Sequence, residues 1–158
     1  MPSPVPAVPQ PQPQSQAHLA PIAYFVGAWT ADAKNPATGQ AFTLSYTITP
    51  SVDGAWLDGA GRAEELGITV SDRWGIDGPT GDIVRVMFDS SGLWGVVRSK
   101  GWDGDRLVLE GDANAPGDGG VVRVRETITK VSATEFGAVW ESLADGAWTV
   151  YSIERLTR

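Results

Sequence analysis

The chain contains no cysteine and a single histidine, His18. Without cysteine there is no disulfide, no thiolate metal ligand and no cysteine nucleophile. One histidine cannot form the cluster of a transition-metal site, and the sequence has neither a Gly-x-Ser-x-Gly nucleophile elbow nor a phosphate-binding glycine loop. We therefore predict no metal ion and no cofactor, and the sequence assigns no catalytic residue.

Long hydrophobic runs and clusters of basic residues are also missing. No stretch approaches the roughly 20 apolar residues of a membrane-spanning helix. The twelve Lys and Arg residues are scattered singly, and the formal net charge is −7. A surface of this kind cannot follow a phosphate backbone, so we expect no nucleic-acid partner and no membrane insertion.

Residues 1–17, MPSPVPAVPQPQPQSQA, hold six of the eleven prolines and no charged residue. Such a segment offers no apolar surface to offset the entropy of ordering, which predicts a disordered tail before a domain at 18–158. A tail of this kind is typical of a secreted chain after its signal peptide has been removed. A periplasmic or secreted location is therefore expected, with a cytoplasmic one as the alternative.

Nineteen glycines gather in short clusters with Asp, Asn and Pro, and the runs between them are rich in β-branched and aromatic residues. This punctuation predicts an all-β fold of about ten strands, at 25–33, 41–49, 55–63, 68–74, 82–88, 93–99, 106–112, 121–130, 135–142 and 147–157. Alternation supports it, since Phe42, Leu44, Tyr46 and Ile48 share one face. Residues 18–25 are the one expected helix.

Ten sequential strands joined by short turns favour closure into an antiparallel up-and-down barrel, which removes the exposed edges of the sheet. A barrel of this size usually encloses more volume than its side chains fill. A residual cavity would suit a small ligand.

The segment Phe25-Val26-Gly27-Ala28-Trp29 resembles the Gly-x-Trp signature of the calycin superfamily. With later segments such as Trp74-Gly75-Ile76-Asp77, Arg125-Glu126-Thr127-Ile128 and Trp140-Glu141, the series looks like the bacterial lipocalin-like proteins related to nitrobindin. The resemblance implies a ten-stranded calycin-like barrel with a short N-terminal helix and an apolar interior. Nitrobindins bind haem through a late histidine, which this chain lacks.

The same resemblance implies a structural role for Gly27 and Trp29. In calycins an arginine near the C-terminus packs on the first-strand tryptophan, and Arg155 is the candidate for that cation–π contact. The other tryptophans occur nearly one per hairpin. Those proposed to line a ligand pocket are Trp56, Trp74, Trp94 and Trp140.

Two arginines and one glutamate complete the candidate binding residues. Arg85 and Arg98 lie on strands beside apolar neighbours, where an inward guanidinium could bind a carboxylate or phosphate; an outward, solvated position is the alternative. Glu126 and Glu154 lie on faces that are otherwise apolar, where a carboxylate could act as an acid or base. A salt bridge to a neighbouring arginine would also explain them.

Three hypotheses follow. The first is a binding protein that holds a small lipophilic or aromatic ligand, with an anionic ligand included. The second is an isomerase, cyclase or hydrolase using Glu126 or Glu154 beside Arg98 or Arg125. The third is a structural or interaction module. We expect the protein to be a monomer or a homodimer.

Overall fold

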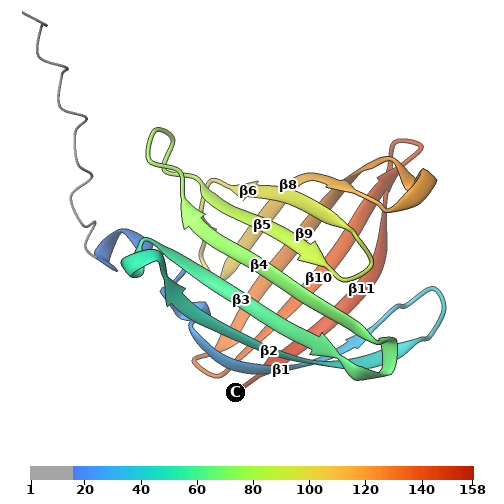
Figure 1. Ribbon diagram of the computed structural model, residues 1–158, viewed down its shortest axis with the longest axis horizontal. Helices are drawn as coiled ribbons and strands as arrows, with labels where there is room; N and C mark the ends of the chain where they lie inside the picture. Colours follow the sequence, from blue (N-terminus) through green and yellow to red (C-terminus); the bar gives the residue numbers. More distant parts are fainter. Residues whose placement is uncertain (1–15) are drawn as a thin grey trace, which may run out of the picture.

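The computed structural model describes residues 16–158 as one highly twisted antiparallel sheet (Figure 1). The predicted tail over 1–17 lies outside this range except for its last two residues. The strands are β1 (Gly27–Lys34), β2 (Ala41–Ser51), β3 (Trp56–Ala63), β4 (Ile68–Ile76), β5 (Ile83–Asp89), β6 (Trp94–Ser99), β7 (Trp102–Asp103), β8 (Arg106–Asn114), β9 (Val121–Ser132), β10 (Glu135–Ala144) and β11 (Ala147–Thr157).

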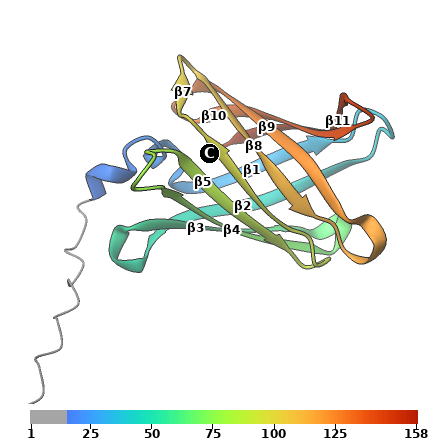
Figure 2. The same cartoon turned by 90° about the horizontal axis from the view of Figure 1, so that it is seen from above.

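The sheet closes on itself, and Figure 2 shows it from above. Neighbouring strands pair in chain order from β1 to β6, β6 pairs with β8, and the order continues to β11, which pairs with β1. Ten strands therefore form a closed barrel, and the two-residue β7 is an extra strand on the edge of β8. The predicted all-β, ten-stranded barrel is confirmed.

Short turns set this topology. The β10–β11 hairpin turns on Asp145 and Gly146, whose φ angles are 51° and 78°. Two consecutive left-handed residues form the tight turn whose twist matches that of the flanking strands, and glycine adopts this conformation without steric cost. Turns of this kind return the chain directly beside the strand it has just left.

Short 3₁₀ helices fill several connections: η1 (Gln16–Leu19), η2 (Ala23–Phe25), η3 (Val52–Gly54), η4 (Glu64–Leu66) and η5 (Gly117–Gly119). The helix expected at 18–25 is thus two 3₁₀ turns. Leu19, Ile22 and Phe25 are all buried, and a spacing of three residues places them on one face in 3₁₀ geometry. Among the described residues, no helix is long and apolar enough to cross a membrane.

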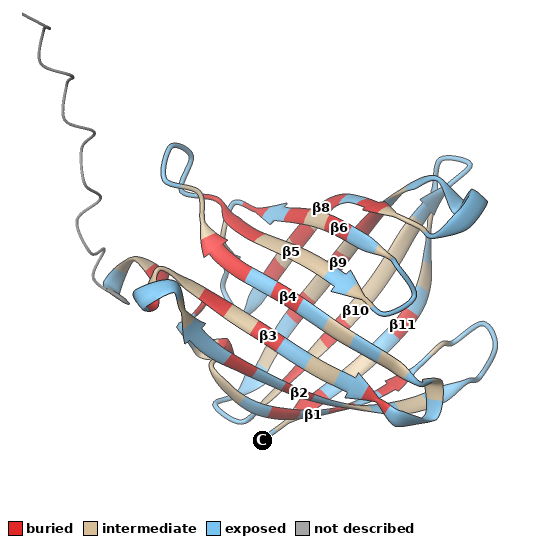
Figure 3. Ribbon diagram, in the orientation of Figure 1, coloured by how far each residue is buried: buried red, intermediate tan, exposed pale blue. Residues whose placement is uncertain are grey.

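Burial alternates along the strands, as Figure 3 shows. On β1 the buried residues are Trp29, Ala31 and Ala33, and on β9 they are Val124, Glu126 and Ile128. Since side chains alternate between the two faces of a strand, these residues point into the barrel. The inward faces of Phe42 to Ile48 and of Val124 to Ile128 match the sequence pattern.

Candidate functional site

An aromatic cluster closes the end of the barrel where η1 and η2 lie. The Phe25 ring packs on Trp74 at 5.0 Å and on Phe136 at 5.5 Å between centroids, and Trp29 lies 4.8 Å from Phe136. Trp102 stacks on Phe25 and donates a hydrogen bond from Nε1 to the Pro21 carbonyl at 2.7 Å. These contacts fasten the N-terminal turns into the barrel end.

A cavity of about 410 Å³ extends from Phe25 through the barrel interior to the turns at the opposite end. Its walls are mainly apolar, and the rim includes Asn35, Gln40, Leu66 and Leu93. This volume lies within the usual range of small-molecule pockets, roughly 300–1,000 Å³.

A buried ion-pair network crosses the cavity. Arg85 on β5 donates from Nε to Oδ2 of Asp72 at 2.6 Å and from Nη1 to Oε2 of Glu126 at 2.5 Å. Burial alone would lower the pKa of Arg85, but Glu126 and Asp72 outweigh that effect and hold its pKa well above the ordinary value. The arginine is therefore charged and engaged on both sides.

Register explains how these side chains meet. Trp74 lies directly opposite Arg85 on β4 and β5, and Trp140 lies directly opposite Glu126 on β10 and β9. Directly opposed residues share a face of the sheet, so each pair points inward together. The Arg85 guanidinium lies 4.5 Å from the Trp74 ring centroid and 5.4 Å from that of Trp140, within cation–π range.

Tyr46 on β2 extends the network by donating its hydroxyl proton to Oδ2 of Asp72. Burial and the nearby Asp72 carboxylate raise the pKa of Tyr46 well above its ordinary value, so the phenol stays protonated. Asp72 Oδ1 is buried and has no hydrogen-bond partner within residues 16–158. Both side chains rest on Gly59, where a Cβ would overlap the Asp72 oxygen and the Tyr46 hydroxyl.

Two consecutive residues of β11, Tyr151 and Ser152, both line the cavity. Their register explains this, since Trp140 pairs with Ser152 but Glu141 pairs with Val150, which leaves Tyr151 as the extra residue of a β-bulge. A bulge breaks the alternation of faces. It brings the Tyr151 ring to 6.4 Å from that of Trp140.

Glu154 adds a carboxylate that lacks a cationic partner. Its Oε1 accepts a hydrogen bond from Ser152 Oγ at 3.0 Å, and among residues 16–158 no Lys or Arg nitrogen lies within 4 Å of it. Burial and the neighbouring Glu126 charge raise the pKa of Glu154 to about 7, against a Ser152 hydrogen bond that lowers it. Burial likewise raises the pKa of Glu126, which Arg85 opposes.

The raised pKa of Glu154 predicts a pH-dependent stability. The folded protein holds this proton up to pH 7, whereas the unfolded chain releases it near 4.5, so ionisation of Glu154 lowers the free energy of unfolding as the pH rises through this window. Glu154→Gln cannot ionise, and we expect it to be more stable than the wild type by roughly 1–3 kcal/mol at pH 8. At pH 4 the difference should nearly vanish.

Urea unfolding at both pH values measures this. Glu110→Gln is the matched control, because Glu110 is half-exposed on the outer face and pairs with Arg123. In this variant Arg123 keeps its second ion pair, with Asp112. We expect that control to show no comparable gain at pH 8. Equal stability of Glu154→Gln and the wild type at pH 8 would mean that water solvates the Glu154 carboxylate.

The structure brings four of the seven predicted binding residues to the cavity: Trp74, Arg85, Glu126 and Trp140. Whether they bind a ligand stays a prediction. The structure places the other three, Trp56, Trp94 and Arg98, outside it. Trp56 covers Gly75 of the neighbouring strand on the outer surface, where a Cβ would overlap its ring. Trp94 is 47 % exposed beside the exposed Phe88 opposite it.

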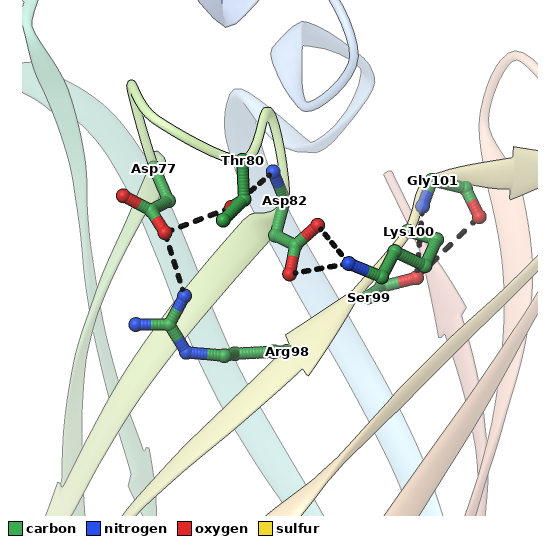
Figure 4. Close-up of polar contacts among 7 residues, drawn as sticks. All are labelled: Asp77, Thr80, Asp82, Arg98, Ser99, Lys100 and Gly101. Carbon is green, nitrogen blue, oxygen red and sulfur yellow. Dashed lines mark hydrogen bonds and ion pairs between the residues drawn. The ribbon is translucent and has the colours of Figure 1, made fainter.

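Arg98 is exposed on the outer face of β6, and Figure 4 shows the hydrogen bond that its Nη1 donates to Asp77 Oδ2, a contact of 3.0 Å. Asp77 accepts a second hydrogen bond from Thr80, and Lys100 pairs with Asp82 in the same turn region. On β6 the inward residues are Gly95, Val97 and Ser99, all buried. Arg98 therefore fastens the β4–β5 turn and does not face the cavity.

The arginine that stacks on Trp29 is Arg158, not Arg155. Its guanidinium lies 4.3 Å from the ring centroid, and its Nη1 donates to the Val26 carbonyl at 2.7 Å. Arg155 pairs with Glu135 on the outer face, because the inward residue beside it is Leu156. Gly27, with a φ of 138°, lies against Arg158.

Sequence reasoning missed Tyr46, Tyr151 and Ser152 as cavity residues and did not connect Asp72 to Arg85. Asp72 was detectable, because it continues the inward series of Ile68 and Val70. Tyr151 had no sequence signal, since only the bulge turns it inward. His18 lies at the closed end, where its Nε2 hydrogen-bonds the Ala55 carbonyl at 3.1 Å.

Within residues 16–158, no group of three or more His, Asp or Glu side chains is arranged to hold a metal ion.

No protein-family model and no curated protein matches the sequence. Among solved structures, the chain is similar to the redesigned β-barrel b11L5F_LGL, with 17% identity, coverage of 86% of this chain and 92% of that one, and a TM-score of 0.41. It is also similar to mFAP1, a redesigned β-barrel bound to DFHBI, with 19% identity, coverage of 91% and 100%, and a TM-score of 0.38.

Proposed function

We propose that this protein binds a small lipophilic or aromatic molecule inside its barrel, and that it is a calycin-type protein related to the lipocalin-like nitrobindin group. The observation that carries the proposal is the cavity of about 410 Å³, which aromatic side chains close at one end. Well-packed protein interiors leave few voids larger than a water molecule. A volume of this size within a rigid barrel is therefore suited to a ligand.

The lining supports this class of ligand. Apolar wall residues such as Phe42, Leu44 and Met87 would exclude water from a bound hydrocarbon or ring, at about 25 cal/mol per Å² of apolar surface buried. Trp74 and Trp140 offer flat faces for stacking.

Titration of the protein with a fatty acid, a retinoid and haem, followed by tryptophan fluorescence and native mass spectrometry, tests the proposal. We expect quenching and a one-to-one complex with at least one apolar probe. Failure of every apolar probe, including uncharged fused-ring compounds small enough for the cavity, would overturn it.

A cavity-filling substitution tests whether the probe binds inside the barrel. Ala63 is buried and lines the cavity, whereas Ala60, on the same strand, is exposed on the outer face. Ala63→Phe should weaken binding of an apolar probe at least tenfold, because the new ring occupies ligand space, while Ala60→Phe should leave it unchanged. Equal affinities of the two variants, measured by fluorescence titration, would place the bound probe outside the barrel.

A specific observation also supports a second candidate function, general acid–base catalysis. Glu154 lines the cavity, and its pKa is raised to about 7 by burial and Glu126, which suits proton transfer near neutral pH. Neither arginine proposed from the sequence is placed to assist it, since Arg125 pairs with Glu141 and lies over Trp148. Arg98 pairs with Asp77 on the outer face. Chemical change of a bound ligand that Glu154→Gln abolishes would support catalysis, and recovery of unaltered ligand would oppose it.

A further inference from the structure

The cavity lining contains more acidic than basic side chains. Four carboxylates line it, from Asp72, Asp89, Glu126 and Glu154. Arg85 is the single cationic lining residue within the described part of the chain. The cavity lining therefore holds more acidic than basic side chains, and the whole chain has a net charge of −7.

Arg85 is not free to receive an anionic ligand. Its Nε and Nη2 engage Asp72, both at 2.6 Å, and its Nη1 engages Glu126. Rings of Trp74 and Trp140 lie within cation–π range of the same guanidinium. An anion would have to displace one of two buried carboxylates, each of which would then lose its partner at a cost of several kcal/mol.

Glu154, in contrast, can accept a cation. Its only hydrogen-bond donor within residues 16–158 is Ser152, at 3.0 Å. It lines the cavity, and the residues directly opposite it on both neighbouring strands, Ala138 and Ala33, have small side chains. A further acceptor in the cavity lining is Asp72 Oδ1, which is buried and has no donor within residues 16–158.

Two aromatic residues lie near Glu154 in the cavity lining, and the charge of Glu154 acts on one of them, Tyr151. Trp140 is directly opposite Ser152, and the bulge brings Tyr151 beside Trp140. An ammonium group is attracted both to a carboxylate and to the face of an aromatic ring, and the attraction is stronger where water is excluded.

We infer that the ligand of this cavity is a small amine with an apolar or aromatic body, whose ammonium group lies at Glu154 beside Trp140 and Tyr151. The body of the ligand would extend along the apolar wall toward the rim. This inference rests on the proposed binding function and narrows it from lipophilic ligands in general, anionic ones included, to cationic ones.

The groups that face Glu154 set the pH dependence. Glu126, Ser152 and Arg85 act on Glu154, and Tyr151 lies within electrostatic reach of it. Burial together with Glu126 raises the pKa of Glu154 to about 7. A bound ammonium stabilises the ionised carboxylate, so amine binding should weaken as the pH falls from 8 to 5 and Glu154 takes up a proton.

Three probes of similar shape test the inference: the amine 2-(2-naphthyl)ethylamine, the alcohol 2-(2-naphthyl)ethanol and the carboxylate 2-naphthaleneacetate. We expect the amine to bind the intact protein at least tenfold more tightly than the alcohol at pH 8, and the carboxylate to bind most weakly. Glu154→Gln should reduce the affinity for the amine about tenfold and change that for the alcohol less than threefold. Glu110→Gln, on the outer face, should change neither.

The outcomes separate the inference from the proposed function. Equal binding of the amine and the alcohol, or preference for the carboxylate, would overturn the cationic ligand and leave a binding cavity. An amine preference that Glu154→Gln does not diminish would also overturn it. Binding of none of the three would overturn the inference, and the proposed function would fall as well only if the fatty acid, the retinoid and haem also failed to bind.

Discussion

Arg85→Met is expected to destabilise the protein by about 3–5 kcal/mol, the usual cost of removing one partner of a buried ion pair. The side chain is 13% exposed and those of Asp72 and Glu126 are 4% and 5% exposed, so neither carboxylate could recover hydration in its present position. Methionine preserves most of the volume and isolates the loss of charge. The free energy of unfolding in urea at pH 7 measures the effect.

Two further variants test whether the loss of stability in Arg85→Met comes from the two carboxylates left without a cationic partner. Arg98→Met removes a half-exposed ion pair on the outer face, for which we expect a change of about 0–1 kcal/mol. Combining Arg85→Met with Asp72→Asn and Glu126→Gln should recover most of the stability, because no buried charge then remains unpaired. If Arg85→Met cost no more than Arg98→Met, water in the cavity would be solvating the two acids.

Gly59→Ala should destabilise the protein by roughly 3 kcal/mol, the upper part of the range for overpacking a core. The new methyl group would overlap Asp72 Oδ1 and the Tyr46 hydroxyl and would lie 2.9 Å from Tyr46 Cζ. Neither side chain can retreat easily, since Asp72 is held by Arg85 and Tyr46 by Asp72. The strain should separate Tyr46 from Asp72.

Gly137→Ala is the matched control on β10. The nearest atom to a Cβ at that position is the Glu154 carbonyl oxygen at 3.7 Å, which is ordinary contact. We expect a change within about 0.5 kcal/mol, or a small gain from the reduced entropy of the unfolded chain. Thermal and urea unfolding of both variants provide the comparison, and equal stabilities would show that the Tyr46–Asp72 pair can move without cost.

The positions of the strands were predictable because turn residues and period-two alternation are local signals. Phe42 to Ile48 and Val122 to Ile128 showed which residues share a face, and the structure places both sets as expected. Ten strands joined by short turns predicted closure of the sheet, which the β1–β11 and β6–β8 pairs complete. Alternation does not state which face is inside, however, when both faces carry apolar residues.

Strand β6 shows why the sequence pattern did not reveal that Trp94 and Arg98 lie outside the cavity. Its larger residues, Trp94 and Arg98, point outward, and its inward positions hold Gly95 and Val97. Arg98 pairs with Asp77 of the β4–β5 turn, and Trp94 lies opposite the exposed Phe88; such contacts between strands are not visible in a local sequence pattern. The Arg85 network is likewise assembled from strands 13 and 41 residues away in sequence.

The pairing of β1 with β11 also bears on how the chain folds. Thr30 pairs with Thr157, so this seam joins segments from opposite ends of the described sequence, whereas most other pairs are hairpins. During synthesis the edges of β1 and β10 stay unpaired until the ribosome has released residues through Thr157. Exposed edges of this kind favour pairing between chains, so the nascent protein is most prone to aggregate in that interval. Seam closure, which requires the longest loop, is expected to limit the rate of refolding.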